Sequence, residues 1–173
     1  MTTAGIEDLC EEADVPNGEQ VDGQSSRNYF YCVWGKTNYE SCPTGTVFDP
    51  FSEACQIPYH VREASTALTA GQAHLSVLPL GVSNLNATLT YSVGSSTSPV
   101  MNAPIYFTSQ NGTHLCIGWT NGLGHASCNA SGLLGTVDQL LRGYTATYGG
   151  NGYNNSHMST LKEAGGHGTV SLL

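Results

Sequence analysis

Short runs of alternating hydrophobic and polar residues fill the chain from residue 65 onward. They are separated by clusters of Gly, Asn and Ser, and they span Ala73 to Leu80, Asn86 to Val93, Pro104 to Ser109, Thr113 to Trp119, His125 to Asn129 and Gly143 to Tyr148. Within the second run, Leu89, Tyr91 and Val93 alternate with polar residues, as in a strand with one buried face. The regular spacing of these runs favours an antiparallel β-sandwich over a parallel sheet.

Two segments depart from this pattern. Leu133 to Arg142 places apolar residues at helical spacing, but Gly132 and Gly143 bound it closely, so we expect a loop with at most one helical turn. The last residues, Gly168 to Leu173, are apolar enough to pair with a neighbouring strand. Because exposed strand edges must be covered or blunted, we expect this tail to be buried in its own sheet or against another subunit.

The first third of the chain is instead rich in cysteines and aromatic rings. Four of the six cysteines and eight of the fifteen aromatic residues lie between Cys10 and Tyr59. The frequency of cysteine and aromatic residues decreases near Val61 to Ala64. This change predicts a small domain over residues 1–62 and a second domain over residues 65–173. A unit of about sixty residues buries too little apolar surface to be comfortably stable without crosslinks.

The order of residues in this first part is specific. Tyr29-Phe30-Tyr31-Cys32 is followed by Cys42-Pro43-Thr44-Gly45-Thr46-Val47-Phe48-Asp49-Pro50 and then by Cys55. This arrangement resembles the type 2 chitin-binding (peritrophin-A) family, a small disulfide-stapled β-hairpin module. The family's pairing implies the disulfides Cys10–Cys32 and Cys42–Cys55.

The family's third disulfide has no counterpart here. Ser26 stands where the family has its second cysteine, and no cysteine lies between Gln56 and Ala64 to supply the sixth. Both partners of one bridge are therefore absent, and a bridge of this kind contributes about 3 kcal/mol. We expect docking against the rest of the chain, or against a partner, to replace it.

The resemblance also implies a ligand. In the family, the aromatic strand before the third cysteine and the hairpin after it are associated with glycan binding, which here selects Tyr29, Tyr31, Trp34, Asn38 and Tyr39. In an extended strand, Tyr29 and Tyr31 point away from the side that carries Phe30, the bridged Cys32 and Trp34. We expect the side with the bridged Cys32 to face inward, which leaves Tyr29 and Tyr31 outward. Sugar rings stack on flat aromatic side chains, and polar neighbours fix their orientation. The alternative is that several of these rings form the core of the small domain.

The second part of the chain has its own resemblance. Pro104 to Thr108, the segment from Cys116 to Cys128, and Gly143 to Tyr148 together resemble a bacterial immunoglobulin-like repeat over about residues 65–160. The resemblance implies an immunoglobulin-like antiparallel β-sandwich, so the whole chain is expected to be all-β. We interpret Cys116 and Cys128 as a disulfide across a hairpin, with a redox or metal pair as the alternative. The fold hosts many roles and does not decide function.

Composition excludes several function classes. The chain has a net charge of -8 and only five basic residues, too few for a nucleic-acid surface. No apolar run is long enough to span a membrane, so no membrane insertion is expected. The cysteine and histidine spacings match no metal site, no cofactor fingerprint is present, and no catalytic motif appears. We therefore expect a non-enzymatic protein without cofactor or metal.

Three functional hypotheses remain. The first is a virion decoration protein on a bacteriophage capsid or tail, in contact with other virion or surface proteins, because the chain starts at Met1 without a leader pattern although it carries six cysteines. The second is a secreted cellular adhesin, or the binding part of a larger chitin-degrading enzyme. The third is a purely structural protein. The first two bind a chitin-like polysaccharide containing N-acetylglucosamine, on a virion surface or outside the cell.

Overall fold

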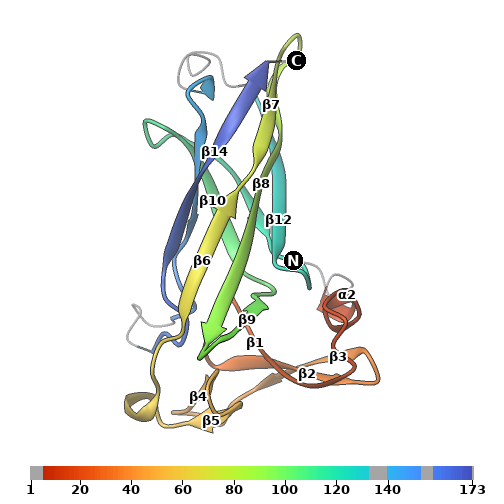
Figure 1. The fold of residues 1–173 in the computed structure, drawn as a ribbon, viewed down its shortest axis with the longest axis vertical. Helices are drawn as coiled ribbons and strands as arrows, with labels where there is room; N and C mark the ends of the chain where they lie inside the picture. The colour runs from red at the N-terminus through yellow and green to blue at the C-terminus, as the bar shows by residue number, and fades with distance from the viewer. Residues whose placement is uncertain (1–5, 133–139, 153–157, 173) are drawn as a thin grey trace.

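The computed structural model describes residues 6–132, 140–152 and 158–172. Almost all of its regular structure is β-strand, which confirms the all-β prediction. A small module formed by the first third of the chain lies at one end of a long β-body formed by the remainder (Figure 1). Among the described residues, no helix is long and apolar enough to cross a membrane.

The module combines a short helix with two small sheets. Its elements are α2 (Leu9–Glu12), β1 (Asn17–Val21), β2 (Asn28–Val33), β3 (Lys36–Ser41), β4 (Val47–Asp49), β5 (Ala54–Gln56) and the 3-10 turn η1 (Pro58–His60). Strands β1, β2 and β3 form an antiparallel sheet in that order, and β4 pairs with β5. Phe30 and Cys32 are buried on β2 while Tyr31 between them is exposed, as strand alternation requires.

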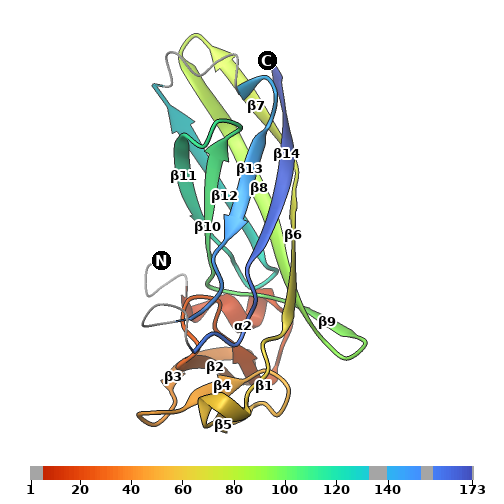
Figure 2. The same cartoon turned by 90° about the vertical axis from the view of Figure 1, so that its left-hand side faces the viewer.

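The described residues of the β-body form nine strands. They are β6 (Ser65–Ala70), β7 (Gln72–Val77), β8 (Leu80–Val93), β9 (Ser96–Pro99), β10 (Pro104–Ser109), β11 (His114–Trp119), β12 (His125–Ser131), β13 (Tyr144–Tyr148) and β14 (Ala164–Leu172). The order is β11-β10-β13-β14-β7-β8-β12, and β6 and β9 also pair with β8. The β8–β9 hairpin projects sideways near the module (Figure 2).

Sequence periodicity located six of these strands, with two differences in their bounds, and it missed β6 and β9. The run from Asn86 to Val93 is the second part of the longer strand β8, and the run from Ala73 to Leu80 contains the turn between β7 and β8. The sheet is also not wholly antiparallel, because Thr169 to Leu172 of β14 pair in parallel with Gln72 to Leu75 of β7. The expectation of an antiparallel sandwich is wrong at this pair.

The two ends of the strand order are joined covalently. Cys116 on β11 is bonded to Cys128 on β12, with 6.2 Å between their Cα atoms. A side chain at Gly118 would lie 2.9 Å from the carbonyl oxygen of Ser127, so the backbones of β11 and β12 approach closely there. The sheet therefore curls back on itself and encloses a core with Leu89, Ile105 and Phe107 in it.

The tail follows the sheet to its end. Its residues up to Leu172 pair with β7 of the same chain, so they lie in their own sheet. The Leu172 side chain is 60% exposed in the single chain, so the burial of this residue against another subunit stays a prediction. Leu173 and residues 133–139 of the expected loop lie outside the described residues.

The module and the β-body share one hydrophobic core. Val21, Cys42 and Phe48 of the module belong to the same buried cluster as Leu68 and Leu161 of the β-body. The division into domains at residues 62 to 65 stays a prediction.

A buried polar network reinforces this junction. Asn102 Nδ2 donates to the Asp22 carboxylate at 3.0 Å, and Asn151 Nδ2 donates to the Asp22 carbonyl at 3.1 Å. The Tyr148 hydroxyl donates to the carbonyl of Gly23 at 2.8 Å. Hydrogen bonds across the contact satisfy polar groups that would otherwise be costly to bury, so they fix how the module sits on the β-body.

Candidate functional site

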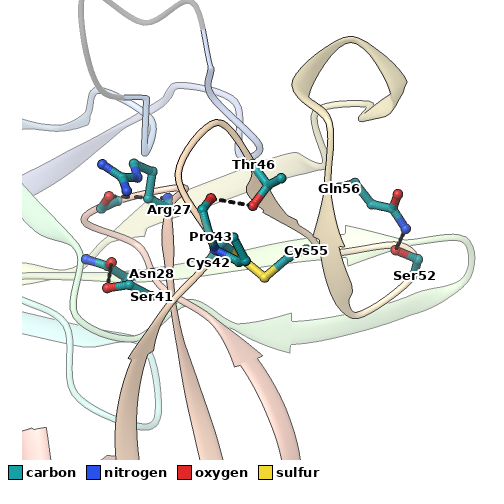
Figure 3. Close-up of a disulfide and its surroundings, with 10 residues drawn as sticks. Arg27, Asn28, Ser41, Cys42, Pro43, Thr46, Ser52, Cys55 and Gln56 are labelled. Atoms are coloured by element: carbon teal, nitrogen blue, oxygen red, sulfur yellow. Dashed lines mark hydrogen bonds between the residues drawn. A yellow bond between two sulfur atoms is a disulfide. The ribbon is translucent and has the colours of Figure 1, made fainter.

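Two disulfides hold the module together. Cys10–Cys32 ties α2 to β2, and Cys42–Cys55 ties the segment after β3 to β5, with Cα separations of 5.8 and 5.7 Å. These are the pairs that the family resemblance implies. Beside the second bridge, the Thr46 hydroxyl donates to the Pro43 carbonyl at 2.7 Å and closes the turn before β4 (Figure 3).

Ser26, which stands where the family has a cysteine, is buried at the junction. Its backbone N–H donates to the carbonyl of Asn151 in the β-body at 2.8 Å, and its carbonyl accepts from the N–H of Phe48 at 2.8 Å. Its hydroxyl oxygen has no hydrogen-bond partner among the described residues. Contacts to β4 and to the β-body therefore hold this position, which supports the hypothesis that docking replaces the absent bridge.

One face of the three-stranded sheet brings together two of the predicted glycan-binding residues. Tyr31 on β2 lies directly opposite Asn38 on β3 and Glu19 on β1. Directly paired residues of an antiparallel sheet project to the same side. Asn38 Nδ2 donates to the Tyr31 carbonyl at 3.2 Å, and the Tyr31 side chain is 42% exposed. The face offers a ring, an amide and a carboxylate to solvent.

Tyr29 lies on the same side of β2, as alternation predicts, but β4 covers it. Its ring stacks on Phe48 with 4.8 Å between the centroids and 14° between the planes. It is partly buried and packs against the shared core. Tyr29 therefore lies at the edge of the core and is less exposed than Tyr31.

Trp34 occupies the tip of the β2–β3 hairpin. Trp34 and Gly35 form the two-residue turn, with φ angles of 52° and 78°. Hairpin turns of this kind favour Asn or Gly, and the left-handed region costs another residue about 1 kcal/mol. The Trp34 side chain is nevertheless 88% exposed. A large apolar residue with a strained backbone and an exposed side chain is a signal of function.

A groove of about 240 Å³ runs beside Trp34. Its lining includes Trp34, Gly35, Val15 and Pro16, together with the acidic residues Glu11 and Asp14. The N–H of Gly35 donates to the Pro16 carbonyl at 2.9 Å, which holds the turn against this segment. The groove thus places a flat aromatic ring next to two carboxylates.

The structure separates Tyr39 from this face. Tyr39 pairs with Phe30 across β2 and β3, so it lies on the opposite side of the sheet from Tyr31. Its ring packs against Phe30 with 4.9 Å between centroids. Its hydroxyl donates to the Asp22 carboxylate at 2.5 Å and accepts from Asn28 Nδ2 at 2.9 Å. Partial burial, and then the charge of Asp22, raise the pKa of Tyr39, whose side chain is 39% exposed.

Asp22 is the buried acid of the module. Burial raises its pKa to about 6, although hydrogen bonds from Tyr39, from the Gln24 N–H and from Asn102 favour the ionised form. The residue is fully inaccessible to solvent. Asp22 therefore acts within the junction and not on the exposed face.

Residues 10–63 match the family model described as the Chitin binding Peritrophin-A domain. This part of the chain is a peritrophin-A chitin-binding domain. The domain corresponds to the module formed by α2 to η1 and contains the Tyr31 face and Trp34. Its family is a binding family, and the loss of one of its disulfides, like the immunoglobulin-like nature of the β-body, stays a prediction.

A relative supports the assignment. The chain is 33% identical over 84 residues to "Chitin-binding domain protein cbd-1" of Caenorhabditis elegans. The match covers 44% of this chain and 6% of that protein, so the chain spans a small fraction of the relative's length. No solved structure matches the chain.

Sequence reasoning missed the acidic partners of the exposed rings. Glu19 reaches the Tyr31 face only through the pairing of β1 with β2, and β1 has no strong alternation of its own. Glu11 and Asp14 belong to an acidic stretch near the start of the chain, and both line the Trp34 groove. No local signal distinguishes them from the other acids near the start of the chain.

Proposed function

We propose that this chain is a non-catalytic accessory protein that binds a chitin-like polysaccharide containing N-acetylglucosamine. The exposed face with Tyr31 and Asn38, together with the indole of Trp34, binds the sugar. The observation that carries the proposal is the exposure of Trp34 at a strained turn of a peritrophin-A domain. The apolar faces of sugar rings stack on Trp34 and Tyr31, while the Asn38 amide hydrogen-bonds to hydroxyl or acetamido groups.

The proposal places the protein outside the cell or on a surface. Its three disulfides are typical of oxidising compartments. The domain shares its core with the β-body, so the β-body serves as a rigid carrier that presents the binding face at one end of the molecule. The protein acts by attachment to a glycan and not by cleaving it.

Retention on insoluble chitin tests the proposal. Trp34→Ala and Tyr31→Ala each remove a stacking surface, and we expect each to weaken binding about tenfold, which corresponds to about 1 to 2 kcal/mol. Tyr59→Ala is the matched control, because Tyr59 is 83% exposed but lies on η1, outside the proposed face. Equal losses in all three variants, or no retention of the unchanged protein, would overturn the proposal and favour a purely structural role.

Two settings fit this activity. The similarity to a nematode protein named for its chitin-binding domain favours a secreted cellular adhesin, or the binding part of a larger chitin-degrading protein. The resemblance of residues 65–160 to bacterial immunoglobulin-like repeats favours a decoration protein of a bacteriophage capsid or tail. Mass spectrometry of purified virus particles separates them, because a decoration protein must be present in intact particles.

A further inference from the structure

The charge of this chain is unevenly distributed. Eleven of its thirteen acidic residues and three of its five basic residues lie within residues 1–63. This part therefore carries the whole net charge of -8, and the remaining residues are balanced, with two acids and two bases. Charge that only kept the chain soluble would not need to be confined to the end that holds the proposed binding face.

Carboxylates flank both exposed rings, Tyr31 on its face of the sheet and Trp34 in its groove. Glu19 lies directly opposite Tyr31 in the sheet register. Glu11 and Asp14 line the groove beside Trp34. The face also carries Lys36, at the hairpin end opposite Val33, so the acids outnumber the base. A glycan that stacks on either ring must therefore pass close to negative charge.

The fold fixes this arrangement. The Cys10–Cys32 disulfide ties α2 to β2, and the N–H of Val15 donates to the Cys10 carbonyl at 3.0 Å. These contacts hold the end of α2, with Glu11 and Asp14, beside the β2–β3 turn. The carboxylates and the indole therefore belong to one groove whose position is set by a covalent bond.

We propose that the binding face prefers amino sugars with free ammonium groups, as in partially deacetylated chitin, over fully acetylated sugar. This inference rests on the proposed function. A fully acetylated chain is neutral and gains nothing from the surrounding carboxylates, whereas each ammonium group is attracted to them. An exposed charge pair contributes at most about 1 kcal/mol and is screened by salt, so three carboxylates give a preference of about tenfold at low ionic strength.

Calorimetric titration with two oligosaccharides of equal length, one fully acetylated and one partially deacetylated, tests the inference. The measurements are made at about pH 5.5, where the sugar amine is protonated. Each titration is repeated in high salt. The acetylated sugar reports on the proposed function, and the ratio of the two affinities reports on the charge preference.

The variant Glu11→Gln/Asp14→Asn removes two groove carboxylates and keeps their shape. Asn also tolerates the left-handed backbone at residue 14, where φ is 55°. The control Glu53→Gln/Glu63→Gln removes the same charge from exposed positions that do not line this groove. We expect the first variant to lose about fivefold in its preference for the deacetylated sugar, and we expect the control to keep that preference.

Each outcome has a distinct meaning. A preference that is lost in high salt and in the groove variant supports the inference. Equal or tighter binding of the acetylated sugar overturns the inference and leaves the proposed function standing. Equal loss in the control variant also overturns it, because the attraction would then come from the overall charge and not from the groove. Absence of binding to either sugar overturns the proposed function and the inference with it.

Discussion

The hydroxyl of Tyr39 donates a 2.5 Å hydrogen bond to the carboxylate of Asp22. Tyr39 belongs to β3 of the chitin-binding domain, and Asp22 follows β1 and pairs with Met101 of the β-body through an isolated parallel bridge. A residue that the sequence places among the glycan contacts is therefore part of the joint between the two regions. Asp22 is fully buried in this joint, whereas the Tyr39 side chain is 39% exposed at its edge.

The stability of this joint is expected to depend on pH. The pKa of Asp22 is raised from 3.8 to about 6 in the folded protein. Below about pH 4 the residue is protonated in both states, between pH 4 and 6 it is protonated only in the folded state, and above pH 6 it is ionised in both. The contribution of Asp22 to the free energy of unfolding is therefore fully present in acid. It decreases by about 3 kcal/mol as the pH rises to about 6.

Thermal unfolding of the Asp22→Asn variant measures this dependence. Asn keeps the shape of the side chain and can receive the Asn102 hydrogen bond and donate to the Tyr39 oxygen. We expect the melting temperature of the variant, relative to that of the unchanged protein, to be about 5 to 10 °C higher at pH 7.5 than at pH 4.5. An identical pH dependence of the two proteins would contradict the assignment.

Tyr39→Phe separates the two roles that can be assigned to this ring. The variant keeps the contact with Phe30 and removes one hydrogen bond to the buried carboxylate, so we expect a loss of about 1 to 2 kcal/mol in the free energy of unfolding at pH 7.5. Retention on chitin should be unchanged. Weakened retention without any change in stability would instead make the Tyr39 hydroxyl a sugar contact.

We expect the stability of the protein to depend on the size of the side chain at residue 29 and not on the hydroxyl of Tyr29. Tyr29→Ala removes the ring that stacks on Phe48 and leaves a cavity, so we expect a loss of about 3 kcal/mol in stability. Tyr29→Phe keeps the stack and should be nearly neutral in denaturant unfolding. Weakened chitin binding in Tyr29→Phe at unchanged stability would place the Tyr29 hydroxyl on the ligand.

The Cys116–Cys128 disulfide is expected to matter for the β-body alone. The double variant Cys116→Ala/Cys128→Ala frees β11 from β12 at the ends of the strand order, and we expect it to cost about 3 kcal/mol. Calorimetric unfolding measures the loss. Affinity for chitin, determined below the melting temperature, should be unchanged, because both cysteines lie outside residues 10–63. A parallel loss of affinity would show that β11 and β12 contribute to binding.

Much of the fold follows from local pattern. Tyr144, Ala146 and Tyr148 alternate with Thr145 and Thr147, and the three are buried on β13, because side chains of a strand point alternately to its two faces. Strand β14 was harder to predict. Its glycines, Gly165, Gly166 and Gly168, carry no side chains to reveal a buried face, and its partners β7 and β13 are distant in the sequence or lie beyond an irregular segment.

The sequence by itself determined the chitin-binding domain, the all-β class and the exposed position of Tyr31, because cysteine order, turn residues and strand alternation act over a few neighbouring residues. Strand alternation alone placed Trp34 on the inward side, and its exposure follows from its place in the turn. Only the tertiary structure decided that Tyr31 faces Asn38 while Tyr39 turns to the other side. The two-residue turn at Trp34 and Gly35 sets that register, and a shift of one residue would exchange the two faces. Likewise, Asp22, Asn102 and Asn151 form one network only because folding brings together residues that no local pattern connects.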